Sequence, residues 1–271
     1  MLDQTARIRR LQLPVARAVA SPEVLVAASY LMALSLAELL LLSSGVLAGA
    51  LAHGALLLML IAHYVAAPGV GYRRLLLPLA LPSLMRLVGL AVPVVSTPQT
   101  VWLVTAGTPI LVAAVLCARA VGGVRPSMLG WPRDPLAQLA VAAGGLMHGL
   151  LAYLVLRPGP IIARLEPAQV ALASVILIVF VAFTEELIFR GVIQSVAAET
   201  LGGPAAGIAV SVITSVIVYA ASLSVPFVLL MAAVSFFFSW IVKESGSLWG
   251  VIGAHALLVI GLLIVWPFVI R

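Results

Sequence analysis

The sequence predicts an all-α fold, a polytopic membrane bundle of about eight or nine transmembrane helices. Of the 271 residues, 63% are hydrophobic and only 9% are charged, whereas about a quarter of the residues in soluble domains are charged. The apolar residues form runs of about 20, the length that a helix needs to cross a bilayer. A water-soluble enzyme is therefore excluded, and the chain leaves no room for a separate soluble domain of useful size.

Nine apolar runs predict the helices in chain order, give or take one. The first run follows the basic segment 1–20 and is too long for the hydrophobic region of a signal peptide. We therefore predict a retained helix, with cleavage near Ala48 as the alternative. Gly- and Pro-bearing connections at residues 68–72 and 122–134 separate later runs. The predicted helices are 24–42, 46–67, 75–95, 101–120, 136–155, 168–190 with a helical extension, 205–221, 227–242 and 248–266.

Arginines near the ends of the apolar runs predict the orientation, because cytoplasmic loops carry an excess of Lys and Arg. Most of them lie in the N-terminal segment and in the loops on its side, whereas Arg157, Arg164 and Arg271 fall on the opposite side. We expect a multi-pass protein of the cell (inner) membrane with a cytoplasmic N-terminus. These signals explain the net charge of +6, so no nucleic acid is expected as a partner. The single cysteine, Cys117, excludes an internal disulfide.

Glu185, Glu186 and Arg190 place three charges within six residues of an otherwise apolar helix. Charges inside a membrane span are costly and usually functional. Glu186 and Arg190 are i,i+4 neighbours and can pair, while Glu185 points about 100° away. Glu185 is thus predicted to be a free carboxylate that can serve as a general base or acid. The alternative is a structural Glu186–Arg190 clamp with Glu185 reaching the surface.

The other ionisable residues inside spans have simpler interpretations. Glu38 in the first predicted helix and Arg86 in the third are expected to form a structural ion pair between these helices. His53, His63 and His148 are expected to be packing or interfacial residues, because no carboxylate lies at helical spacing from them.

Two motifs carry a family resemblance. The first is Glu185-Glu186-xxx-Arg190, which is followed by a glycine, and the second is the Gly-Ser-Leu-Trp run at 246–249 that leads into His255. They match the EExxxR motif and the third motif of the CPBP family of membrane proteins (CAAX proteases and bacteriocin-processing or immunity proteins, also called ABI). This family includes the CAAX prenyl endopeptidases. The sequence resembles it over about residues 168–263.

The resemblance implies a role for each residue. Glu185 would be the base that activates a water to attack a peptide carbonyl, with Glu186 and Arg190 as its supports. His255 would be a catalytic or oxyanion-stabilising partner. Charge and hydropathy divide the chain into a basic cytoplasmic segment at 1–20 and N-terminal transmembrane helices at 21–160, and the resemblance implies a CPBP-like core at 161–271 that carries EExxxR and the third-motif His255.

The sequence departs from the family pattern in two motifs. The second motif, Phe-xxx-His, aligns with Val218 and Ser222, and the Asn of the third motif aligns with Val259. Losing one oxyanion donor lowers a rate by about 10²–10³, and losing a general acid or base has a comparable effect. Tyr219 or Ser222 could donate a hydrogen bond instead, but Ser222 is expected near the membrane face opposite His255.

Three functions are compatible with these observations. The favoured one is a degenerate family member that acts as an accessory, immunity or scaffold subunit in a membrane complex. The alternative is an active glutamate-dependent intramembrane endopeptidase that cleaves a membrane-associated or lipidated peptide. The third, a transporter, would require two similar halves with paired, broken helices, and the sequence has no such symmetry. The expected partners are the lipid bilayer and either a membrane-associated peptide or membrane-protein subunits.

No cofactor is expected, and a metal site is disfavoured. Glu185, Glu186 and His255 could offer three ligands to zinc, but adjacent residues on a helix diverge by about 100°. No HExxH motif or second histidine completes such a set.

Overall fold

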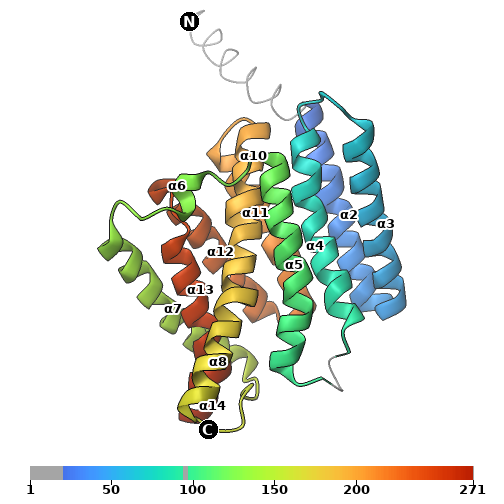
Figure 1. Cartoon of the computed structure of the whole chain (residues 1–271). Coiled ribbons are helices and arrows are strands. Elements are labelled where there is room, and N and C mark those ends of the chain that lie inside the picture. Colours follow the sequence, from blue (N-terminus) through green and yellow to red (C-terminus); the bar gives the residue numbers. More distant parts are fainter. Residues whose placement is uncertain (1–20, 94–96, 271) are drawn as a thin grey trace, which may run out of the picture.

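The computed structural model describes residues 21–93 and 97–270. The segment 1–20, expected to be a basic cytoplasmic arm, lies outside the described residues, as does the end of the predicted helix 75–95. Within the described ranges, nine helices are long and apolar enough to cross a membrane. The predicted all-α bundle is therefore confirmed, and the protein is a multi-pass membrane protein in contact with the lipid bilayer (Figure 1).

The helices follow the predicted runs closely. Six of the spans are single α-helices, while the sixth and the last contain π-helical turns and the seventh ends in a 3₁₀ turn. One further short helix, α6, lies in the loop before α7. The bounds are α2 Pro22–Ser44, α3 Val46–Ala66, α4 Arg73–Ala91, α5 Gln99–Val121, α6 Pro126–Leu129, α7 Pro135–Leu156, α8 Pro167–Leu177, α9 Thr184–Glu186, α10 Ser195–Thr200, α11 Pro204–Tyr219, α12 Val225–Ser245, α13 Trp249–Ile260 and α14 Trp266–Val269.

Local sequence determines where the helices begin and end. Proline occupies the first turn of α2, α7, α11 and α12, where its missing N–H is not needed. The Asp134 side chain caps α7 by accepting a hydrogen bond from the Ala137 N–H. α5 and α12 end at Gly122 and Gly246, each with φ of 65°, a left-handed conformation that favours glycine.

The long sixth span, residues 167–200, is the central element of the bundle. It comprises α8, a π-helical segment Ile178–Phe183, α9, a second π-helical segment Leu187–Gln194, and α10. Its second half packs in an apolar cluster with α2, α3, α4, α5 and α11. Its first half packs with α7, α12 and α13 in a second cluster. This span therefore joins the two groups of helices that Figure 1 shows on either side of it.

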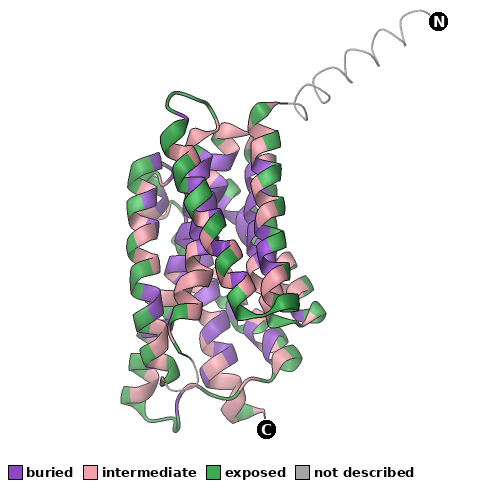
Figure 2. Ribbon diagram, turned by 90° about the vertical axis from the view of Figure 1, so that its right-hand side faces the viewer, coloured by how far each residue is buried: buried purple, intermediate pink, exposed green. Residues whose placement is uncertain are grey.

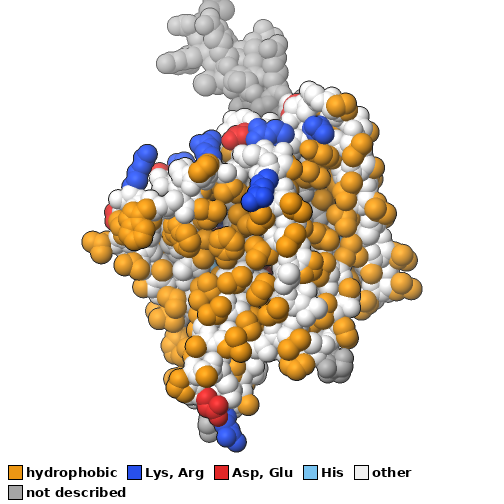
Figure 3. Space-filling model, in the orientation of Figure 1, with side chains coloured by type: hydrophobic (Ala, Val, Ile, Leu, Met, Phe, Trp, Pro, Cys, Tyr) orange, Lys and Arg blue, Asp and Glu red, His pale blue; other side chains and the backbone are white. Residues whose placement is uncertain are grey.

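The surface has the polarity of a membrane protein. Buried residues concentrate along the inner faces of the helices, and exposed residues cover the outside (Figure 2). Exposed leucines, valines and phenylalanines form most of the sides of the bundle, and charged side chains gather at its two ends (Figure 3). The helix bounds place Arg73 and Arg74 (start of α4), Arg125 (after α5) and Lys243 (last turn of α12) at the end with more Lys and Arg, and Arg157 and Arg164 (after α7) at the other end.

Candidate functional site

The backbone of the sixth span is irregular at the predicted charged motif. Thr184, Glu185 and Glu186 form one α-helical turn between the two π-helical segments. The Thr184 hydroxyl donates a hydrogen bond to the Val179 carbonyl at 2.8 Å, and the Ser195 hydroxyl donates one to the Arg190 carbonyl at 3.4 Å. In both cases the acceptor lies five residues earlier in the chain. π-helical turns inside α-helices are rare and occur frequently at functional sites. The motif therefore lies where the backbone itself departs from regular geometry.

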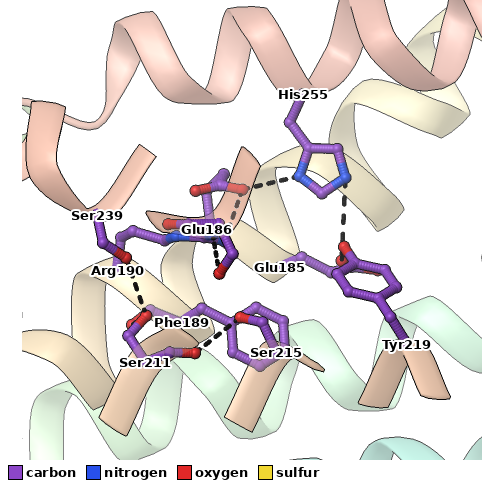
Figure 4. Close-up of polar contacts among 10 residues, drawn as sticks. Glu185, Glu186, Phe189, Arg190, Ser211, Ser215, Tyr219, Ser239 and His255 are labelled. Atoms are coloured by element: carbon purple, nitrogen blue, oxygen red, sulfur yellow. Dashed lines mark hydrogen bonds and ion pairs between the residues drawn. The ribbon is translucent and has the colours of Figure 1, made fainter. Parts of the chain in front are cut away.

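Glu186 is fully buried and accepts two hydrogen bonds through one oxygen. Its Oε1 lies 3.0 Å from a guanidinium nitrogen of Arg190 and 2.8 Å from His255 Nδ1 (Figure 4). The predicted i,i+4 ion pair is therefore present. Arg190, only 2% exposed, also donates to the Ser235 hydroxyl and carbonyl at 2.8 and 3.2 Å. Because an ionised carboxylate only accepts, His255 donates through Nδ1 and presents Nε2 on its opposite side.

Glu185 has different partners. The Tyr219 hydroxyl donates to Glu185 Oε2 at 2.6 Å, and His255 Nε2 lies 3.9 Å from the same oxygen. The Glu185 side chain is 18% exposed, and no guanidinium of the described residues forms an ion pair with it. The fold thus brings Glu185, Glu186, Arg190 and His255 together around the histidine ring, and Tyr219 joins them from α11 (Figure 4).

The two positions aligned with the expected family residues contribute no hydrogen bond to this cluster. Ser222 is exposed in the turn Ala220–Ser222 after α11, and its hydroxyl accepts from the Ser224 N–H. Val259, one turn beyond His255, is buried in the apolar cluster around α13. Neither side chain supplies a polar group near Glu185.

A cavity of about 200 Å³ reaches Glu185 from the side of α4 and α5. Arg86, Thr184 and Glu185 provide its polar side chains, and His255 is not among the described residues that line it. The apolar part of its wall is formed by Pro82, Met85, Trp102, Leu103, Ala106, Gly107, Ile110, Phe180, Val181 and Val218. Glu185 is therefore the member of the cluster that a molecule in this cavity can touch.

A second polar cluster lies beside the cavity. Arg86 Nε donates to Glu38 Oε1 at 2.8 Å, so the predicted ion pair between α2 and α4 is present. His53, expected to be a packing residue, is fully buried with its Nε2 3.7 Å from Glu38 Oε1. A terminal nitrogen of Arg86 donates to the Val218 carbonyl at 2.9 Å. This contact connects the N-terminal helices to the residue before Tyr219.

The two remaining histidines contact aromatic side chains. His63 contacts the hydroxyls of Tyr30 and Tyr72 at 2.8 and 3.3 Å, and His148 packs against the rings of Phe237 and Phe238. Among the residues that the structure describes, no group of three or more His, Cys, Asp or Glu side chains could hold a metal ion.

Sequence reasoning identified four members of the site but missed Ser235 and the contact of Tyr219 with Glu185. Ser235 and Ser239 stand four residues apart in the otherwise apolar α12, and this spacing was the available signal. Tyr219 was recognised only as a possible donor, because its distance from Glu185 in the chain gives no local indication of a contact.

Part of the chain matches a known protein family. Residues 167–261 match the family model described as Type II CAAX prenyl endopeptidase Rce1-like. No curated protein and no solved structure matches the chain. The matched segment contains Glu185, Glu186, Arg190, Tyr219 and His255. Over residues 167–261 the chain is therefore similar to this family, and the predicted resemblance to the CAAX prenyl endopeptidases is confirmed for that segment.

Proposed function

We propose that the protein is a glutamate-dependent intramembrane endopeptidase that hydrolyses a peptide bond in a membrane-associated or lipidated peptide. The observation that carries the proposal is the convergence of Glu185 Oε2, His255 Nε2 and the Tyr219 hydroxyl, next to a cavity that Glu185 lines. The description of the matching family as a prenyl endopeptidase supports a lipidated peptide as the substrate class.

In the proposed reaction, one water molecule lies between Glu185 and His255. The 3.9 Å separation of Glu185 Oε2 and His255 Nε2 lets a single water hydrogen-bond to both atoms. Glu185 accepts a proton from this water, whose oxygen adds to the peptide carbonyl carbon. When the tetrahedral intermediate collapses, the C–N bond breaks and the proton passes from Glu185 to the departing amine nitrogen.

Glu186 and Arg190 support the reaction through His255. Glu186 accepts a hydrogen bond from His255 Nδ1 and so keeps Nε2 directed towards Glu185. The carboxylate of a Ser-His-Asp triad orients its histidine in the same way. Arg190 neutralises the buried charge of Glu186. In this proposal both residues position another group, and neither touches the substrate.

Tyr219 takes the place of the histidine that the second motif lacks. Its hydroxyl donates to the Glu185 carboxylate and orients it. In this proposal the hydroxyl turns to donate to the developing oxyanion once Glu185 has taken up the proton of the water. Ser222, at the aligned position itself, is exposed in a turn and has no part in the mechanism.

A catalytically degenerate accessory subunit is the second candidate, and a specific observation favours it. The position of the expected Asn holds the buried Val259, so one expected oxyanion donor is replaced by a hydrocarbon. The same helices would then bind a partner subunit in the membrane without cleaving it.

The decisive experiment is cleavage of a membrane-tethered, prenylated peptide by the purified protein in liposomes. We expect Glu185→Gln to lower the turnover rate by about 10² or more, because it removes the general base. Tyr219→Phe should lower it by about 10–10², because one donor to the oxyanion and to Glu185 is lost.

Glu244→Gln, at the exposed end of α12, is the matched control and should leave the rate unchanged. Cleavage that survives Glu185→Gln would overturn the proposed mechanism. A folded wild-type protein that cleaves neither prenylated nor unprenylated peptides would establish the accessory role instead.

The proposal includes a location. We place the protein in the cell (inner) membrane with the N-terminus and the end that carries Arg73, Arg74, Arg125 and Lys243 in the cytoplasm, following the excess of positive charge at that end. The substrate would then enter the cavity from the bilayer, between α4 and α5.

A further inference from the structure

A polar column runs through the apolar interior between the sixth span and α12. We define it by Glu186, Arg190 and Gln194, which stand four residues apart on the sixth span, and by Ser235 and Ser239, which stand four residues apart on α12. All five are buried. Arg190 donates to the Ser235 hydroxyl, and Gln194 Nε2 donates to the Ser239 carbonyl at 2.8 Å.

Three atoms of this column have hydrogen-bonding capacity that the chain does not satisfy. Glu186 Oε2, Arg190 Nε and Gln194 Oε1 are all buried without a hydrogen-bond partner from the described residues. An isolated unpaired polar atom in a protein interior is destabilising. Three of them at i, i+4 and i+8 on one helix face indicate a shared partner, and bound water is the ordinary partner of such groups.

The column opens at one end into a polar pocket. Gln194 and Ser195 line a pocket of about 230 Å³ together with Ser127, Glu199, Arg125 and Lys243. This pocket lies at the Arg-rich end of the bundle, where charged side chains mark the membrane surface (Figure 3). The other end of the column is Glu186, whose Oε1 accepts from His255.

We propose that the polar column holds a file of bound water molecules that connects the aqueous surface at Arg125 and Lys243 with the interior at Glu186 and His255. The existence of this path does not depend on the chemistry at Glu185. If the proposed function is correct, the path supplies the water that each hydrolysis consumes, while the peptide occupies the separate cavity beside α4 and α5. Water and peptide would then reach the glutamates from different sides.

Silver ions test the path without any measurement of activity. Ag⁺ is small and hydrated and reacts with thiols, so it modifies a cysteine that water can reach. In a Cys117→Ala background in lipid nanodiscs, Ser239→Cys and Ser235→Cys, each replacing a hydroxyl by a thiol, should be modified. Ala197→Cys is the matched control, because Ala197 is fully buried near the same end of the sixth span but packs in an apolar cluster. It should stay unmodified over the same period.

Equal modification of Ser239→Cys and Ala197→Cys would overturn the path, because it would show only general opening of the bundle. Protection of both Ser239→Cys and Ser235→Cys would overturn it as well. Modification is read as the loss of later maleimide labelling in the denatured protein, and the thermal unfolding of each variant before silver is added identifies any variant that fails to fold.

The second part of the test measures the peptidase activity of variants in the column. Gln194→Leu removes the polar group at the mouth of the column and should lower kcat about 10-fold with KM unchanged, because peptide binding is on another side. Ser239→Ala, a smaller change, should lower kcat by a lesser factor. If silver modifies Ser239→Cys but the wild-type protein has no peptidase activity, the water path stands and the proposed function is rejected. If the wild-type protein is active and Gln194→Leu has the same kcat, the column does not supply the water for hydrolysis.

Discussion

Glu185 and Glu186 are neighbours in the chain, but the fold gives them unlike surroundings. Glu186 is sealed between a guanidinium and an imidazole, whereas Glu185 meets a tyrosine hydroxyl and a cavity. A buried ion pair that loses one member leaves an uncompensated charge, which costs about 3–5 kcal/mol. A hydrogen bond between a neutral donor and a partly exposed carboxylate contributes much less. The two residues therefore differ in what they do for stability.

Glu186→Gln should consequently lower the midpoint of thermal unfolding in detergent more than Glu185→Gln does. The first change leaves the 2% exposed Arg190 without its counter-charge, while the second keeps both side chains of the ion pair. Circular dichroism or tryptophan fluorescence during heating measures both midpoints. Equal shifts for the two variants would contradict this division of roles.

The Glu38–Arg86 pair makes a second prediction at this scale. Glu38→Gln and Arg86→Leu should each destabilise the protein, and the double variant should recover much of the loss. Arg86→Leu should be the more harmful single change, because it also removes the donor to the Val218 carbonyl. Denaturation of all four proteins completes a double-mutant cycle, and strictly additive losses would mean that the pair contributes nothing.

At the scale of elements, the position of His255 depends on the close approach of α7 and α13. A Cβ atom at Gly145 would overlap the carbonyl oxygen of Ala254, and one at Gly149 would meet the carbonyl oxygen of Leu258 at 2.6 Å. These obstacles are backbone atoms, which cannot move aside as a flexible side chain can. Small residues that let backbones approach are typical of helix contacts in membranes.

Gly145→Ala should therefore push α13 away from α7 and shift His255, the neighbour of Ala254. We expect a loss of about 1–3 kcal/mol in stability, typical of overpacking, together with reduced turnover. Gly144→Ala is the matched control on the same helix, since nothing lies within 4 Å of its Cβ position. It should be neutral or slightly stabilising, because alanine is the better helix former. Similar losses in both variants would rule out the packing explanation.

The sequence could predict features that depend on one helix alone, but not those that depend on how two helices pack. Each membrane span was predictable because its apolar run is continuous and long, and the Glu186–Arg190 pair was predictable because i,i+4 contacts are local. The π-helical turns around Thr184 were not predictable, since no residue type encodes them and they depend on packing with other helices. The contact of Tyr219 with Glu185 depends on how α11 lies against the sixth span, which periodicity alone does not determine.

At the scale of the whole molecule, nine spans place the two ends of the described chain on opposite faces of the bundle (Figure 1). With a cytoplasmic N-terminus, alkaline phosphatase fused after Arg271 should be active outside the cytoplasm, and green fluorescent protein at the same place should not fluoresce. Insertion of the same reporters after Gly202, in the exposed turn between α10 and α11, should give the reverse pattern. Fluorescence from the Arg271 fusion would invert the proposed orientation.

The cavity wall has a consequence for how such a protein can diversify. The glutamates lie on the sixth span, within the Rce1-like segment, but much of the wall that faces Glu185 comes from Pro82, Met85, Trp102 and Leu103 on α4 and α5, outside that segment. If the proposed function is correct, substitutions on these two helices would change which peptide fits while Glu185 and its partners stay as they are. Much of the selectivity would then be encoded outside the stretch that carries the reacting groups, and the two could evolve separately.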